Sequence, residues 1–129
     1  MTQLERIGFF RELRHGRADG PSIHDAIREP MRPSDREAVA AYLEAGAVLV
    51  ATSERADDVL DPTRQAVSPI NRLTDGVYVW SQDLAYYVRT YGAAVPDDLV
   101  ARANAGPPPT FTESEVMELA EAFSPPPPD

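Results

Sequence analysis

Apolar and polar residues alternate with two different periods along this chain, and the clearest change of period falls in residues 73–92. The run 77–80 is β-branched and aromatic, the composition typical of a strand. Asp75-Gly76 precedes it, and this dipeptide favours a tight hairpin turn because glycine accepts a positive φ. The stretch therefore predicts a turn followed by a strand.

A helix is predicted directly after that strand. Ser81 has the side-chain oxygen expected of an N-cap, and Gly92 is the expected C-terminal stop. Between them, apolar residues recur at the spacing of one helix face, which predicts a stripe that faces the core: Leu84, Tyr87, Val88 and Tyr91.

The first third of the chain predicts a strand and two helices. Residues 6–13 place Ile7, Phe9 and Leu13 on one face by period two, which indicates a strand. A short helix is expected over 22–29, capped by Ser22 and ended by prolines. A second is expected from Ser34, whose spacing to Glu37 is that of a capping box, to a stop at Gly46; its apolar stripe is Val39, Tyr42 and Leu43.

Two further strands are expected before the turn at Asp75. Residues 47–51 are apolar at every position, which predicts a central strand buried on both faces. Residues 67–73 predict a weaker strand, and Pro69 assigns it to an edge or a bulge because proline cannot donate to a sheet.

Two helices follow residue 92. The first opens at Pro96 and stops at Gly106, and a polyproline spacer covers 107–111. Residues 112–123 predict an amphipathic helix with a capping box between Thr112 and Glu115, followed by a disordered proline tail over 124–129. This helix either docks on its own domain, which we favour, or lies in a groove of a partner.

Together these elements predict a single small α+β core domain over residues 1–106. Its mostly antiparallel four-stranded sheet is covered by helices, with the C-terminal helix appended after the spacer. The length of 129 residues is typical of one domain.

Composition and charge narrow the function classes. The chain has no cysteine, no lysine and a net charge of −9, and its N-terminus lacks the pattern of a signal peptide. No apolar run is long enough for a membrane span, so we expect a soluble cytoplasmic protein. Residues 1–36 carry seven arginines against six acids, whereas 37–129 carry five against fifteen. This acidity disfavours nucleic-acid or anionic-membrane binding and suits a basic protein partner. A role in solubility alone would also explain the acidic charge.

The sequence contains no pattern that specifies catalysis, a cofactor or a metal. Its two histidines, His15 and His24, lack converging ligands in the sequence, and His24-Asp25 would point to different sides of a helix. The acidic cluster of Glu54, Asp57, Asp58 and Asp61 lacks the ligand spacing and glycine of a calcium loop, so a solvated turn is expected there.

An aromatic surface is the strongest candidate for a binding site. Tyr78 and Trp80 share one face of the predicted strand, and Tyr86 lies about 100° from the core stripe of the following helix. If helices cover only the other sheet face, these rings would be exposed near acids and could anchor a partner. If helices cover both faces, the rings belong to the core, which is the alternative we favour.

Several segments of this chain carry a resemblance to other proteins. They are the pattern Thr-Asp-Gly-x-Tyr-x-Trp at 74–80, Tyr-Tyr-Val at 86–88, and the runs 45–52 and 57–62. These segments resemble small uncharacterised proteins of GC-rich bacteria. Some of these proteins resemble immunity partners of secreted toxins. The resemblance covers roughly residues 40–100, contains no catalytic motif, and implies a binding protein.

Three hypotheses follow from the sequence. The first is a non-enzymatic, immunity-type or antitoxin-type inhibitor that covers a basic partner through Tyr78, Trp80, Tyr86 and the acidic cluster. The second is a small hydrolase-like or other enzyme that uses His24 with a carboxylate such as Asp75 or Glu54. The third is an assembly component that associates with copies of itself through its asymmetric charge; the oligomeric state is left open.

Overall fold

The central sheet of the computed structural model has four short strands in the spatial order β1–β6–β5–β2. These are β1 (Glu5–Arg6), β6 (Tyr78–Ser81), β5 (Arg72–Thr74) and β2 (Ala47–Val50). β5 pairs antiparallel with both β6 and β2, whereas β1 runs parallel to β6. The predicted α+β class is therefore confirmed, but the sheet is mixed because the N-terminal strand joins its far edge in the parallel sense.

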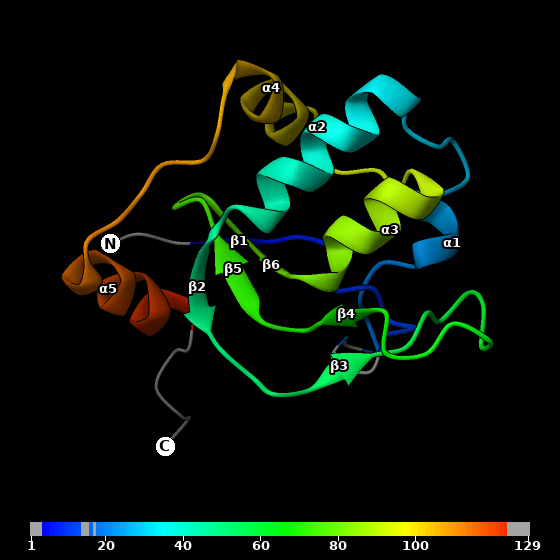
Figure 1. Cartoon of the computed structure of the whole chain (residues 1–129), viewed down its shortest axis with the longest axis horizontal. Helices are drawn as coiled ribbons and strands as arrows, with labels where there is room; N and C mark the ends of the chain where they lie inside the picture. The colour runs from blue at the N-terminus through cyan, green and yellow to red at the C-terminus, as the bar shows by residue number, and fades with distance from the viewer. Residues whose placement is uncertain (1–3, 14–15, 17, 124–129) are drawn as a thin grey trace.

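The structure describes residues 4–13, 16 and 18–123, and five helices lie within them. Their bounds are α1 (Ile23–Ala26), α2 (Pro33–Glu44), α3 (Asp83–Tyr91), α4 (Asp97–Ala105) and α5 (Glu113–Phe123). Helices α2, α3 and α4 pack together above the sheet, and α5 lies beside β2 at the opposite end of the molecule from α1 (Figure 1).

Alternation along the strands divides the sheet into two buried faces. Leu73 and Trp80 are cross-strand neighbours in the core that the helices α2, α3 and α4 cover. Thr74 and Val79 are also paired across β5 and β6, are fully buried, and point to the other face. Arg6 is in register with Val79 and stacks on Phe123 of α5, so α5 covers this second face.

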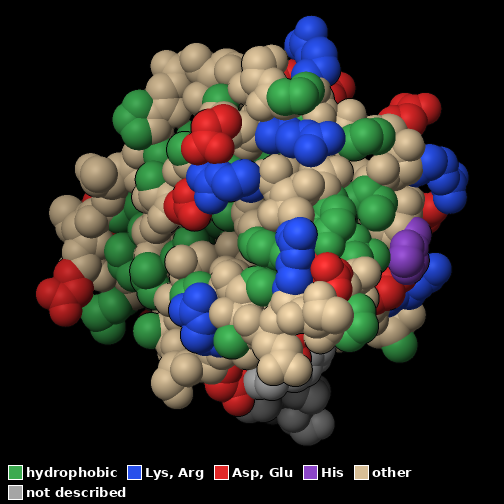
Figure 2. Space-filling model, turned by 45° about the vertical axis from the view of Figure 1, so that its right-hand side comes forward, with side chains coloured by type: hydrophobic (Ala, Val, Ile, Leu, Met, Phe, Trp, Pro, Cys, Tyr) green, Lys and Arg blue, Asp and Glu red, His purple; other side chains and the backbone are tan. Residues whose placement is uncertain are grey.

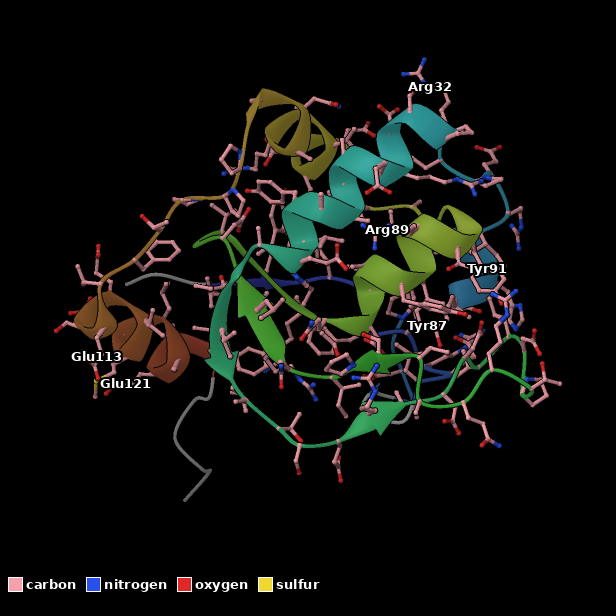
Figure 3. All side chains as sticks on the ribbon, viewed as in Figure 1. Arg32, Tyr87, Arg89, Tyr91, Glu113 and Glu121 are labelled. Atoms are coloured by element: carbon pink, nitrogen blue, oxygen red, sulfur yellow. The ribbon has the colours of Figure 1, made fainter. Side chains whose placement is uncertain are left out.

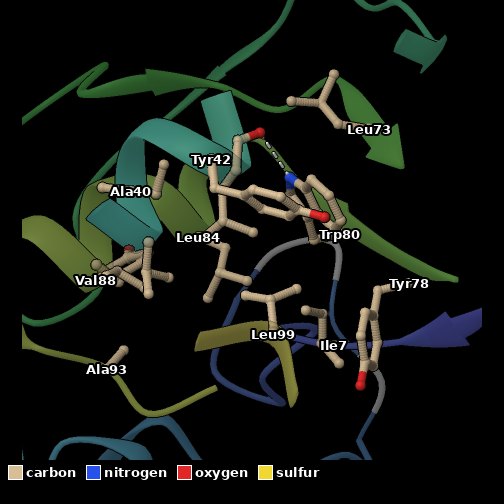
Figure 4. Close-up of a cluster of buried hydrophobic side chains, with 14 of the residues drawn as sticks. Ile7, Ala40, Tyr42, Leu73, Tyr78, Trp80, Leu84, Val88, Ala93 and Leu99 are labelled. Atoms are coloured by element: carbon tan, nitrogen blue, oxygen red, sulfur yellow. Dashed lines mark hydrogen bonds between the residues drawn. The ribbon is translucent and has the colours of Figure 1, made fainter. Parts of the chain in front are cut away.

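The main core is built around Trp80, which is fully buried. Its indole Nε1 donates a hydrogen bond of 3.0 Å to the carbonyl oxygen of Leu43, at the end of α2 (Figure 4). Tyr42 and Tyr78 are also buried. Three residues of the predicted helix stripe, Leu84, Tyr87 and Val88, lie in the same cluster, and the fourth, Tyr91, is partly buried and packs against it. Helices cover both faces of the sheet, so the interpretation of Tyr78 and Trp80 as core rings is confirmed. Their alternative placement on an exposed sheet face is wrong.

Strand β2 is an edge strand, which corrects the expectation that residues 47–51 form the centre of the sheet. Val48 and Val50 are 47% and 40% exposed. The centre is instead occupied by β5 and β6, where all four residues of β6 are buried. A continuous apolar run indicated burial on both faces, but here α5 packs against β2 and takes up only part of that apolar surface.

The predicted strand over 67–73 is split between two sheets. Ser68–Pro69 forms β4, which pairs antiparallel with β3 (Arg55–Ala56) in a separate two-stranded sheet, while residues from Arg72 onward join the central sheet as β5. Pro69 accordingly lies in a strand with one partner only, as its missing N–H requires. The chain thus has five strands where three were expected between α2 and α3.

The predicted strand over 6–13 is short, because the chain leaves the sheet after Arg6. Gly8 has a φ of +74°, and a Cβ at this position would come within 2.7 Å of the side chain of Leu84. Residues 10–13 then form a turn, with the N–H of Leu13 donating to the carbonyl of Phe10. The strand therefore ends near Gly8, where the positive φ suits glycine, although the alternation of apolar residues alone predicts a strand as far as Leu13.

Several predicted helix ends are confirmed and two are wrong. The Ser22 hydroxyl accepts from the N–H of His24, Gly92 ends α3 at a φ of +71°, and Thr112 and Glu115 form the predicted capping box. In contrast, α2 begins at Pro33 with no side-chain cap, and Ser81 ends β6 while Gln82 is the N-cap of α3.

The C-terminal helix docks on its own domain, as favoured. α5 packs along β2, and Phe123 stacks on Phe9 with ring centroids 6.4 Å apart. Arg6 donates from Nη2 to the carbonyl of Phe123, which places a cation at the negative end of the helix. The predicted proline tail, 124–129, lies outside the described residues.

Candidate functional site

The acidic cluster predicted as a partner surface builds a loop between β3 and β4. Asp58 is 2% exposed, and its Oδ1 accepts from the amides of Leu60 and Asp61 at 2.7 and 3.1 Å. Its Oδ2 accepts from the hydroxyls of Tyr86 and Tyr91 at 2.7 and 2.6 Å. Four donors therefore satisfy one buried carboxylate, and this side chain is not available to a partner.

The neighbouring acids of this loop also have internal partners. Asp57 Oδ1 accepts from the amide of Ala66, a residue with a φ of +49°, and Asp61 accepts from both the amide and the hydroxyl of Thr63. Asp61 also forms an ion pair with Arg64. Glu54 is exposed and lies immediately before β3. Of the four predicted acids, Glu54 and Asp57 are exposed, Asp61 is half-buried, and Asp58 is buried.

Three tyrosines of α3 hold this loop against the helix. Tyr86 and Tyr87 meet edge to face, and the Tyr87 hydroxyl accepts from the amide of Val59 at 3.0 Å. Tyr87 and Tyr91, both labelled in Figure 3, stack on each other. Tyr86, the third predicted aromatic anchor, is half-buried and also accepts a hydrogen bond from Arg64.

The phenols of this cluster are held in their protonated form. The hydrogen bond to Asp58, together with burial, raises the pKa of Tyr91 to about 12. Burial, and then the hydrogen bond to Asp58, raises the pKa of Tyr86, and burial raises that of Tyr87. A phenol that donates to a carboxylate keeps its proton at neutral pH, so the cluster serves to position the loop.

A second buried carboxylate fixes the turn between β5 and β6. Asp75 is 2% exposed; its Oδ1 accepts from the amides of Val77 and Tyr78, and its Oδ2 accepts from the hydroxyl of Tyr42 at 2.7 Å. Gly76 has the positive φ, +93°, that the predicted tight turn requires. Tyr78 adds a link to α4, because its hydroxyl donates to Asp98 at 3.0 Å.

These positions do not assemble the catalytic site of the enzyme hypothesis. His24 is exposed on α1, whereas Asp75 is engaged inside the turn at the end of β5, and Glu54 precedes β3. His15 lies outside the described residues. Within residues 4–13, 16 and 18–123, no group of three or more His, Cys, Asp or Glu side chains has the arrangement of a metal site.

A group of exposed glutamates lies on α5. Residues 103–123 contain four glutamates and no arginine: Glu113, Glu115, Glu118 and Glu121. All four are exposed, and none forms an ion pair with a described residue. Glu115 closes the capping box at the amide of Thr112, and the hydrogen bonds with Thr112 lower its pKa. Glu113 and Glu121 point away from the sheet in Figure 3.

An exposed methionine lies among these glutamates. Met117 is 62% exposed and is four residues from both Glu113 and Glu121, so the three side chains lie in one row along the helix. The opposite side of α5 carries Leu119, which is buried. We define the acidic helix face as Glu113, Met117, Glu118 and Glu121.

The sequence contains a signal for this face, because residues 112–123 predict an amphipathic helix and include its four glutamates. From the sequence alone, we instead assign the binding role to the loop acids. They are close together in the sequence, whereas the number of internal donors that each carboxylate meets is decided by the fold.

Comparison of the chain with protein-family models, with curated proteins and with solved structures finds no match in any of the three. The resemblance to immunity partners of toxins therefore stays a prediction. No helix among the described residues combines the length and the apolar character that a membrane crossing needs.

Proposed function

We propose that this protein is a non-enzymatic, cytoplasmic binding module that inhibits a basic partner protein in the manner of an immunity protein or antitoxin. The acidic helix face carries the proposal. It presents four glutamates, counting Glu115 at its edge, on a segment that contains no basic residue. A charged surface of one sign attracts a surface of the opposite sign and raises the rate of encounter.

The apolar centre of this face supports a protein as the partner. Met117 is a flexible, polarisable side chain that adapts to different apolar surfaces, and methionine is enriched at protein interfaces. Charges around an apolar residue match the usual arrangement of an interface, in which a dry centre is surrounded by a polar rim.

Elsewhere on the described surface, several acids are paired with arginines. Ion pairs link Arg28 to Asp25, Arg64 to Asp61, and Arg89 to Glu37 and Glu44. Figure 2 shows the resulting intermixture of blue and red side chains on one face of the molecule. Mixed surfaces produce weak fields, so we expect α5 to dominate the attraction of a basic partner.

The test is affinity capture with the purified full chain from an extract of the native host, at low and at high salt, followed by identification of the retained proteins. We expect the wild-type protein to retain a basic protein at low salt and to release it at high salt. The double variant Glu118→Gln/Glu121→Gln should lose it. A matched control, Asp19→Asn/Glu37→Gln, removes the same charge from exposed positions outside α5 and should retain the partner.

The retained protein is then purified and its binding is measured by titration calorimetry with all three forms. Equal affinity of the α5 variant and the wild-type chain would contradict the proposal, as would a partner of acidic charge. Light scattering across the same salt range tests the self-association hypothesis separately. A mass that corresponds to a dimer at low salt only would favour that hypothesis instead.

A further inference from the structure

Two hollows adjoin the chain segment 94–96, which connects α3 to α4. The first has a volume of about 500 Å³ and is lined mainly by apolar residues, among them Ile7, Phe10 and Pro21. The second has a volume of about 600 Å³ and contains Met31 and Val100. Both are lined by Ala94 and Val95, so this segment forms the ridge between them. Volumes of this size accommodate one or more side chains of a ligand.

The ridge itself is extended and offers a main-chain donor. Pro96 has φ and ψ angles of −55° and 143°, and the N–H of Ala94 is bound to the carbonyl of Ala26. In the described part of the chain, no hydrogen bond uses the N–H of Val95. Extended segments with such a group bind other extended chains, because main-chain hydrogen bonds give affinity and flanking pockets give specificity.

The charges around the hollows are unequal. Arg28 pairs with Asp25 at 2.6 Å, and Arg32 pairs with Asp35 at 3.3 Å. Arg6 lines the first hollow and stacks on Phe123. Two acids of the second hollow, Glu29 and Asp97, are exposed and form no ion pair with a described residue. The uncompensated negative charge is therefore at the second hollow.

We propose that the two hollows form one binding groove for an extended peptide segment that carries an apolar and a basic side chain at neighbouring positions. The apolar side chain occupies the first hollow. The basic side chain lays its aliphatic stem against Met31 and Val100 in the second hollow, and its charge reaches Glu29 and Asp97. A carbonyl of the peptide accepts from the N–H of Val95.

This groove is separate from the acidic helix face. It is lined by residues of β1, α1, α2 and α4 and of the segments that connect them. No residue of α5 lines it, although Arg6 and Phe9 of the first hollow contact Phe123 at the end of that helix. The inference stands without the proposed function.

The probe is a short, blocked, fluorescently labelled peptide in which leucine and arginine alternate, titrated with the full chain at low salt and followed by anisotropy. The blocking variant is Ala94→Trp, because Ala94 is exposed and its side chain lines both hollows. The matched control is Ala105→Trp, at the exposed end of α4 and outside both hollows. We expect Ala94→Trp to weaken binding about tenfold or more, and Ala105→Trp to leave it unchanged.

The charge requirement is tested with Glu29→Gln and Asp97→Asn, which should each weaken binding by about threefold at low salt and less at high salt. Glu37→Gln, which changes an exposed acid of α2 that lines neither hollow, should leave the binding of this peptide unchanged. In an amide spectrum of the isotope-labelled chain, the resonance of Val95 should shift on titration.

Three results would overturn the inference. The first is equal binding of the probe by the wild-type chain and Ala94→Trp. The second is equal binding of a peptide in which glutamate replaces arginine. The third concerns a small apolar molecule. If neither peptide binds but an apolar dye does, and Ala94→Trp abolishes that binding, the groove takes a small apolar molecule and the peptide proposal is wrong. Circular dichroism of each variant shows whether it is folded.

Discussion

The indole Nε1 of Trp80 donates to the carbonyl oxygen of Leu43 over 3.0 Å, and this bond joins the middle of the sheet to the last turn of α2. A carbonyl in the last turn of a helix lacks the usual partner within the helix, and that of Leu43 accepts a bond of 3.4 Å from the N–H of Gly46. Trp80 adds a second and shorter bond at this position. Trp80 is also in ring contact with Tyr42, whose hydroxyl holds Asp75 in the turn before β6. One side chain thus connects α2, the sheet and the turn.

Replacement of Trp80 by Phe tests this connection. The change removes the hydrogen bond, leaves the Leu43 carbonyl with only the 3.4 Å bond from the N–H of Gly46, and opens a cavity. We expect it to lower the free energy of unfolding by about 2–4 kcal/mol. Urea titration followed by circular dichroism measures the change. Val77→Ala is the control, because Val77 is exposed just before the same strand and its truncation should have little effect. Similar losses for both variants would contradict this role of Trp80.

Tyr91→Phe tests the loop held by Asp58. The hydroxyl of Tyr91 donates to a buried carboxylate, and we expect its removal to cost about 1.5–3 kcal/mol of folding stability. Tyr86→Phe should act through the same carboxylate, so the double variant should depart from additivity. Hydrogen exchange of the amides of Leu60 and Asp61 should accelerate in each variant, and unchanged exchange would count against the role of these phenols.

The raised pKa of Tyr91 predicts how folding stability changes at high pH. The pKa of Tyr91 is raised from 10.0 to about 12 in the folded protein. A raised pKa contributes stability that is present below pH 10 and is lost as the pH rises through about 12. The stability of the wild-type chain should therefore fall between these pH values. The difference between the wild-type chain and Tyr91→Phe should shrink over that interval in urea titrations at a series of pH values.

Glu12→Gln tests the loss of folding stability that is expected at low pH. Burial would raise the pKa of Glu12, but hydrogen bonds from the hydroxyl of Ser22 and the amide of Ile23 outweigh it, and its pKa is lowered from 4.5. A lowered pKa contributes stability that is present above about pH 4.5 and is lost as the pH falls below it. We expect Glu12→Gln to cost about 1 kcal/mol at neutral pH and to match the wild-type chain in strong acid. A constant difference at all pH values would be inconsistent with this assignment.

Leu119→Ala tests the docking of α5 on the second face of the sheet. Leu119 is the buried residue of this helix, and we expect its truncation to cost about 2–3 kcal/mol. Met117→Ala is the control within the same helix, because Met117 is 62% exposed and should change stability by no more than about 0.5 kcal/mol. Limited proteolysis should cut the spacer before α5 faster in the first variant only. Equal protection of the two variants would contradict the docking.

The sequence by itself determined the local elements whose causes lie within a few residues. The turn at Asp75 and Gly76, the end of α3 at Gly92 and the capping box at Thr112 were predicted correctly. Each depends on a backbone conformation or a side-chain hydrogen bond that neighbouring residues supply. These elements can therefore be predicted without knowledge of contacts between distant parts of the chain.

The tertiary structure decided which apolar surfaces are covered and which carboxylates are neutralised. Residues 47–50 are apolar throughout, yet β2 lies at an edge because β5 and β6 pair with each other through the hairpin and occupy the centre. Likewise, Asp58 and Glu118 are both acids in polar stretches. Asp58 meets two phenols from α3, and Glu118 has no cation within reach on α5. Sequence patterns give the chemistry of a side chain, but its partners come from segments that only the folded chain brings together.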